Sequence, residues 1–131
     1  MYEPIRTKPV VHRMGDAAAD YPHRSRGEAL DIQLAGHLAA LLAVTDELGL
    51  DEDAAAIAGQ VARLRGAEPA RAPQGGPAGD AAVLHQRAHD LAARALLVAA
   101  SRADTTAAIL AAERMDAHAA ALESLDLAGA H

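Results

Sequence analysis

The strongest pattern in the chain is a series of large apolar residues that recurs every three or four positions from residue 30 onward. At 100° per residue these positions fall on one face of a helix, and they are Leu30, Leu34, Leu38, Leu41, Val44, Thr45 and Leu48. Ser25 and Glu28 have the spacing of a capping box, and Gly49 followed by Leu50 is typical of a Schellman-type stop. The pattern therefore predicts a helix over residues 26–48.

A second helix is expected directly after this stop. Asp51 is suited to be its N-cap, and a narrow apolar seam with helical spacing continues to Gly66, so the helix is predicted over residues 51–65. Residues 67–79 are rich in proline and glycine. We interpret them as a linker, either mobile or crossing the whole length of the helices.

Two more helices are predicted in the second half of the chain. Asp80 is the N-cap of a helix over residues 80–102, and the last helix covers residues 104–125. No glycine or proline separates them. However, the apolar face of the last segment is about a quarter turn out of phase with the face before it, in the sense opposite to left-handed coiling. We therefore expect a break at residues 101–104.

The N-terminal segment, residues 1–24, lacks a sustained helical period and contains Pro4, Pro9 and Pro22. Residues 1–27 carry five basic and three acidic side chains, a net charge of +2, whereas the remainder of the chain carries −8. We interpret residues 1–24 as an extended basic arm, either a tail or a strap over the helices.

Composition narrows the choice of fold and function. Thirty-six of the 131 residues are alanine, and the chain has no Phe, Trp or Cys, which excludes a disulfide framework, a thiolate metal site and a cysteine nucleophile. The scarcity of aromatic and β-branched residues argues against a β-sandwich. The apolar runs are shorter than the ~18–20 residues that span a membrane. The expected class is a soluble, cytoplasmic, all-α protein.

Four amphipathic helices with two tight connections favour an up-and-down four-helix bundle over residues 25–127, with the extended N-terminal arm outside it. Alanine on the inward faces buries few methylene groups, so the core of a monomer should be small. Self-association would compensate. Large apolar residues away from the predicted core faces are the candidates for a dimer contact: Ile32, Leu42, Leu97 and Ile109.

Three histidines, His37, His85 and His118, fall on the inward side of the predicted helices, and a fourth, His89, falls at the edge of that side. His85 and His89 are one turn apart, which lets one helix offer two nitrogens to a metal ion. A third imidazole from a facing helix would complete a site for zinc, nickel or iron. Such a site is loosely similar to that of the DinB-like metal-dependent transferases, but no longer motif matches and no family follows. The structural alternative is that these histidines merely fill space beside backbone carbonyls or water.

Arg114 also lies on an apolar arc, one turn before His118. A guanidinium in that position must extend along its aliphatic stem toward water or find an anion. No acid shares its face, so a partner would come from another helix, from the arm or from a bound carboxylate or phosphate. Arg114, His118 and His85 form the candidate anion pocket, although we expect the guanidinium to reach solvent.

The sequence thus predicts a non-enzymatic protein-interaction or regulatory module that acts through a protein partner or through self-association. The alternative is a metal- or ligand-binding bundle, extending to a metal-dependent hydrolase or transferase. The chain has no glycine-rich phosphate loop, and the acidic bundle argues against nucleic-acid binding. Buried histidines also predict that stability declines as pH falls from about 7 to 5.

Overall fold

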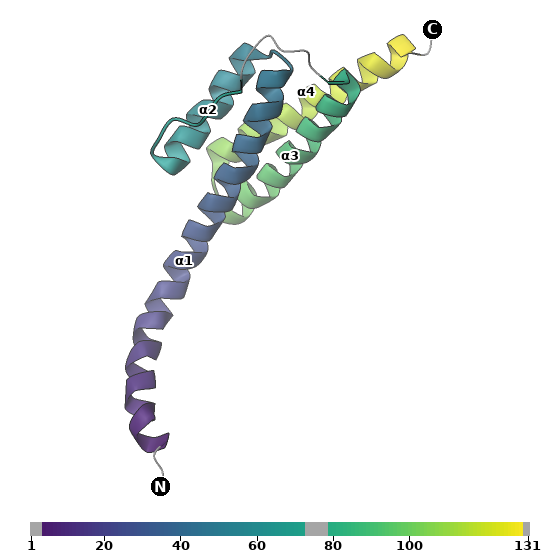
Figure 1. Ribbon diagram of the computed structural model, residues 1–131. Coiled ribbons are helices and arrows are strands. Elements are labelled where there is room, and N and C mark those ends of the chain that lie inside the picture. Colours follow the sequence, from purple (N-terminus) through teal and green to yellow (C-terminus); the bar gives the residue numbers. More distant parts are fainter. Residues whose placement is uncertain (1–3, 73–78, 130–131) are drawn as a thin grey trace.

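The computed structural model describes residues 4–72 and 79–129, with side chains from Ser25 onward. Within these ranges the chain forms four helices and no strand, which confirms the all-α prediction (Figure 1). The helices are α1 (Pro4–Glu47), α2 (Asp51–Arg65), α3 (Ala81–Arg102) and α4 (Thr105–Gly129).

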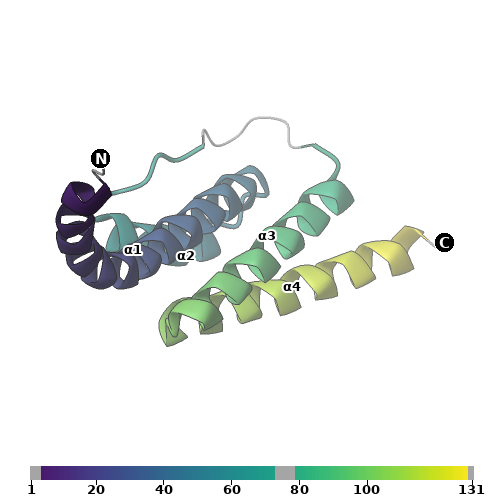
Figure 2. The same ribbon diagram turned by 90° about the horizontal axis from the view of Figure 1, so that it is seen from below.

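The helices follow the order up, down, down, up. Arg63 near the end of α2 pairs with Asp104 just after α3 at 2.8 Å, so the C-terminal ends of α2 and α3 lie at the same end of the molecule. The start of α3 therefore lies at the opposite end of the bundle from the end of α2 (Figure 2). This differs from the strictly alternating up-and-down order that we predicted. The reason is the length of the linker, which at about 3.3 Å per residue easily exceeds the ~22 Å length of α2.

The packing is uneven around the bundle. α1 lies between α2 and α3, and α4 packs along α3. The α2–α4 seam is instead spanned by ion pairs, Arg63–Asp104 and Arg114–Asp53, with nitrogen–oxygen distances of 2.8 and 3.0 Å. Two closely packed hairpins, α1–α2 and α3–α4, thus meet mainly through α1 and α3.

The conformation predicted for residues 1–24 is wrong for the part that the structure describes. The backbone of residues 4–24 is helical and continuous with the rest of α1, and it extends well beyond the other helices (Figure 1). Ser25 and Glu28 are consequently interior helix residues and not a capping box. Pro4 occupies the first position of the helix, where no amide donor is needed. A proline inside a helix costs a hydrogen bond and bends the axis, but its φ angle remains helical.

Left-handed residues end three of the helical segments. Gly49 (φ 75°) closes the α1–α2 turn: its amide bonds to Asp46 at 3.0 Å, and the Leu50 amide bonds to Thr45 at 3.2 Å. This is the predicted Schellman motif. Gly66 (φ 73°) ends α2 as predicted. The predicted cap at Asp51 is wrong, because Leu50 is the N-cap residue and no side chain caps this helix.

The predicted break between α3 and α4 is confirmed, although it forms without glycine. Ala103 adopts a left-handed conformation (φ 60°), and the Asp104 amide bonds back to Ala99 at 2.8 Å. The Asp104 carboxylate then accepts the Ala107 amide at 3.1 Å and caps α4. Asp80 caps α3 in the predicted way. α4 continues to Gly129, four residues beyond the predicted end.

The core is built mainly from α1, whose buried arc is wider than the leucine pattern predicted. Leu42, a predicted dimer contact, is 1% exposed and belongs to the core. α1 packs against α2 on one side and α3 on the other, so positions on both flanks of the leucine stripe are buried. Ile32, Leu97 and Ile109 are exposed, as predicted.

In the part of the chain that the structure describes, one segment, Ser25–Glu47, is long and apolar enough to span a membrane by length and composition. This is weak evidence for a membrane span, because the core helix of a bundle has the same composition. Here the leucines Leu34, Leu38 and Leu41 are buried among the other helices.

Candidate functional site

A hydrogen-bonded pair of histidines joins α3 to α4. The Nδ1 atoms of His85 and His118 are 2.9 Å apart, and the ring centroids lie 5.1 Å apart. His118 has no exposed surface, whereas His85 is half-buried. The sequence analysis predicted that both would point inward, and the structure brings these two together.

The surroundings of His118 favour the tautomer in which its Nδ1 atom carries the proton. One Nδ1 must donate and the other must accept, and His118 Nε2 is buried without a hydrogen-bond partner. When His118 donates from Nδ1, its Nε2 is a lone pair, and no N–H is buried without an acceptor. The pKa of His118 is lowered to about 4, mainly by burial and further by the charge of Arg114 and by His85. His118 is therefore neutral at pH 7.

Arg114 connects the same cluster to α2. Its Nη1 atom is 3.0 Å from Asp53 Oδ1, and only 10% of its side chain is exposed. The expectation that this guanidinium reaches solvent is therefore wrong: Asp53 in the first turn of α2 supplies the anion. The open α2–α4 seam lets the carboxylate approach while it stays 40% exposed. Arg114 Nε remains buried with no partner.

The other two predicted ligands lie apart from the pair or at its edge. His89 Nδ1 is 3.4 Å from the carboxylate of its neighbour Asp90, and the His89 side chain is 29% exposed. His89 still contributes to the electrostatic environment of His118. His37 is half-buried on α1. Across residues 4–72 and 79–129, no three side chains of the metal-binding kind come together, so the predicted three-histidine centre is not assembled.

An ion pair on a buried carboxylate, which the sequence analysis missed, holds part of the linker. Asp46, 1% exposed, accepts Arg71 Nη2 at 2.8 Å and Nε at 3.0 Å. It also accepts the Ala72 amide at 3.2 Å. The hydrogen bond from Arg71 lowers the pKa of Asp46 against the opposing effect of burial. Residues 71–72 are thus docked on the bundle, and the only sequence signal was an acid on the core arc of α1.

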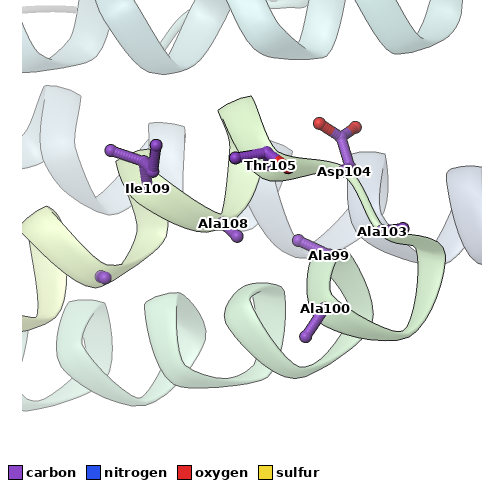
Figure 3. A pocket seen from close by; sticks show the side chains of 8 residues that line it. Ala99, Ala100, Ala103, Asp104, Thr105, Ala108 and Ile109 are labelled. Atoms are coloured by element: carbon purple, nitrogen blue, oxygen red, sulfur yellow. The ribbon is translucent and has the colours of Figure 1, made fainter.

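The α3–α4 hairpin carries a different kind of site at its turn. An apolar groove of about 350 Å³ lies between the two helices (Figure 3). It is lined chiefly by small side chains, including Ala99, Ala100, Ala103 and Ala108, and Ile109 stands beside it with 54% of its surface exposed.

Large apolar side chains continue along the outside of this hairpin. Leu97 lies about 180° around α3 from the buried Ala88, and Val83 lies about four turns before Leu97 on the same side. Ile109 and Leu127 are five full turns apart on α4. Their exposures are 63% for Val83, 70% for Leu97, 54% for Ile109 and 64% for Leu127. We refer to the side of α3 and α4 that carries these four residues as the outer hairpin face.

Comparison with known proteins does not assign either site. No protein-family model, no curated protein and no solved structure matches this chain. The function must therefore be argued from the residues themselves.

Proposed function

We propose that this protein is a cytoplasmic, non-enzymatic helical module that acts by binding another protein. One observation carries the proposal: the α3–α4 hairpin buries mostly alanines and leaves five large apolar side chains exposed. Of the six exposed large hydrophobic residues in the described ranges, only Ile32 lies outside this hairpin. Scattered exposed apolar residues are ordinary, but Val83 recurs on the side of α3 that carries Leu97, and Leu127 recurs on the side of α4 that carries Ile109. Adjacent helices that both expose large apolar residues in this way favour a contact with another protein.

Two further features support an interaction role. The helical backbone of residues 4–24 extends beyond the bundle (Figure 1), and an isolated helix of this length is only marginally stable in water without packing. The segment that contains it is basic, whereas the rest of the chain carries −8. Both features support a role of this segment in binding a partner.

Site-specific photo-crosslinking in the cells that make this protein tests the proposal. A photoreactive phenylalanine analogue at Leu97 should give one discrete crosslinked product, because the outer hairpin face is covered in the cell. The same analogue at Ala55, an exposed position on α2, is the matched control and should give none. Absence of a product at Leu97, or an identical product pattern at both positions, would contradict the proposal.

A second candidate function is suggested by the cluster of His85, His118 and Arg114. Two of its nitrogens, Arg114 Nε and His118 Nε2, are buried without partners, and each such group costs about 1–3 kcal/mol. A small carboxylate or phosphate would satisfy the guanidinium. A metal ion could bind the His85–His118 pair, since two nitrogens on tetrahedral zinc lie about 3.3 Å apart, not far from the observed 2.9 Å.

Thermal melting distinguishes these ligands. Wild-type protein is melted with acetate, with inorganic phosphate, and with zinc, nickel or ferrous ions. A rise in melting temperature that Arg114→Gln abolishes supports the anion, and a rise that His85→Ala abolishes supports the metal. No rise with any of them would rule out this second function and leave the interaction proposal unaffected.

A further inference from the structure

We propose that the outer hairpin face is covered by a second copy of this chain, with α3 of each copy lying across α4 of the other. This inference rests on the proposed function and names the partner that the face fits. The size of the outer hairpin face, the charges of α3 and α4 and the register of these two helices support it.

The outer hairpin face is long enough for a contact between two copies. The outer hairpin face is about 33 Å long and about 20 Å wide, so a symmetric contact would bury about 1,300 Å² in total. That is in the lower range of specific dimer interfaces.

The two helices of the face carry opposite charge. α4 presents only acidic groups to solvent, and they are Glu113, Asp116, Glu123 and Asp126. α3 presents Arg87 and Arg94 beside Val83 and Leu97, with Asp90 as its single exposed acid. A two-fold axis parallel to the hairpin places α3 on α4 of the second copy, twice over. This arrangement brings basic groups against acidic ones, whereas α4 against α4 would bring acids together.

The register of the hairpin aligns the apolar residues in the same arrangement. Leu97 lies six residues before Ala103, and Ile109 lies six residues after it, so they are level on the antiparallel helices. Leu97 of one copy therefore meets Ile109 of the other beside the alanine-lined groove (Figure 3). At the opposite end Val83 and Leu127 come within about one turn of each other.

The charged residues between these two apolar ends follow the same register. Arg94 lies nine residues before Ala103 and Glu113 ten residues after it, so each Arg94 comes within one residue of the level of Glu113 of the second copy. Asp90 falls level with Asp116 and makes a like-charge contact, and Asp126 falls level with Asp80, the N-cap of α3. Gln86 at 3.1 Å and His89 at 3.4 Å from the Asp90 carboxylate reduce that repulsion.

Sedimentation velocity of the full chain tests the occupant and the face. The wild type should dimerise with a Kd of about 10 µM, as expected for an interface of this size with few anchoring residues. Leu97→Glu with Ile109→Glu should raise this Kd at least about 30-fold, because four carboxylates would be buried per dimer. Ile32→Glu is the matched control: Ile32 is 73% exposed but lies on α1, and its substitution should leave the Kd unchanged. Circular dichroism verifies that all variants are folded.

A charge exchange between two variants tests the orientation. Arg94→Glu alone and Glu113→Arg alone each place like charges across the contact and should weaken dimerisation about 3- to 10-fold. In an equimolar mixture, the heterodimer again has opposite charges at both contacts, because the two introduced side chains face each other and the unaltered Arg94 faces the unaltered Glu113. Its affinity should return to within about twofold of wild type. A pairing within one chain cannot restore association on mixing.

Each result separates this inference from the proposed function. A wild type that stays monomeric at about 200 µM overturns the second copy as partner, and the crosslinking at Leu97 then decides whether another protein covers the face. A dimer that Ile32→Glu disrupts and Leu97→Glu with Ile109→Glu does not would overturn the assignment of the face. Failure of the mixture to associate more tightly than either variant overturns the α3-on-α4 orientation.

Discussion

The two hairpins of this protein differ in the size and polarity of their buried side chains. In α1–α2 the buried apolar residues are mostly large, and they are Leu34, Leu38, Leu41, Leu42, Val44, Ile57 and Val61. In α3–α4 the buried apolar residues are six alanines and two leucines, Leu84 and Leu91, and the remaining buried side chains are Arg114 and His118. The first hairpin supplies most of the buried apolar volume, and the second supplies close backbone contact, polar groups and an apolar exterior.

This difference indicates where stability and recognition are located. Burial of a large aliphatic side chain stabilises a fold by about 1.5–3 kcal/mol, and an alanine contributes far less. The α1–α2 hairpin and its contact with α3 must therefore provide most of the stability. Because alanine lets α3 and α4 approach closely, five of their large apolar residues remain exposed, where a partner can use them.

The largest expected effect comes from the α1 core. Leu38→Ala removes a side chain with no exposed surface, and such changes cost about 2–5 kcal/mol because a cavity remains. The matched change Leu97→Ala, at a residue that is 70% exposed, should alter the unfolding free energy of the monomer by less than about 0.5 kcal/mol. Urea unfolding at low protein concentration measures both. Equal losses would show that the two hairpins do not divide the roles in this way.

The second effect is a pH dependence that belongs to the α3–α4 side. His118 has a pKa of about 4 in the folded chain and 6.5 as the ordinary value, so between these values the unfolded chain binds more protons. Stability is therefore full above about pH 6.5 and falls as pH decreases toward 4, by at most about 3 kcal/mol. The sequence predicted a decline from about 7 to 5, and the structure moves this window lower.

Thermal melting of the wild type and of His118→Gln across this range isolates the contribution. Glutamine does not titrate, so the variant should lose less stability than the wild type between pH 6.5 and 4. The carboxylate Asp46 does not interfere in this window, because its pKa is lowered and its stabilisation is lost only at more acidic pH. Parallel profiles for the two proteins would contradict the assignment to His118.

The smallest effect concerns the close approach of α3 and α4. Ala111→Leu adds a large side chain at a position with no exposed surface, and overpacking of this kind costs about 1–3 kcal/mol. Ala55→Leu, at an exposed position on α2, should change the unfolding free energy by less than about 0.5 kcal/mol. Urea denaturation of the two variants compares them. A stabilised Ala111→Leu variant would mean that the helices are not in close contact there.

Periodicity and helix-end residues allowed much of the fold to be predicted from the sequence. The bounds of α2 and α3, the Gly49 turn and the break at Ala103 all depend on local preferences, and all are found in the structure. The prediction failed where a local signal had a competitor. Ser25 and Glu28 have capping-box spacing, but the preceding residues continue the helix. Prolines were interpreted as excluding a helix, although they only weaken it.

The candidate site was less predictable, because it depends on which helices become neighbours. A helical wheel placed His85, His118 and Arg114 inward, but it could not state that His85 and His118 would meet at 2.9 Å. The pairing of Asp53 with Arg114 could not be predicted either, because it depends on a contact between residues 61 positions apart.

The sequence by itself determined that four helical segments form and the approximate bounds of α2, α3 and α4, because these follow from interactions within a few residues. Only the tertiary structure decided the parallel course of α2 and α3, the burial of Leu42, the docking of Arg71 on Asp46 and the gathering of exposed apolar residues on one hairpin. These features arise from contacts between distant segments. Their geometry depends on how four helices with different numbers of large apolar residues pack around one small core, and no local pattern encodes it.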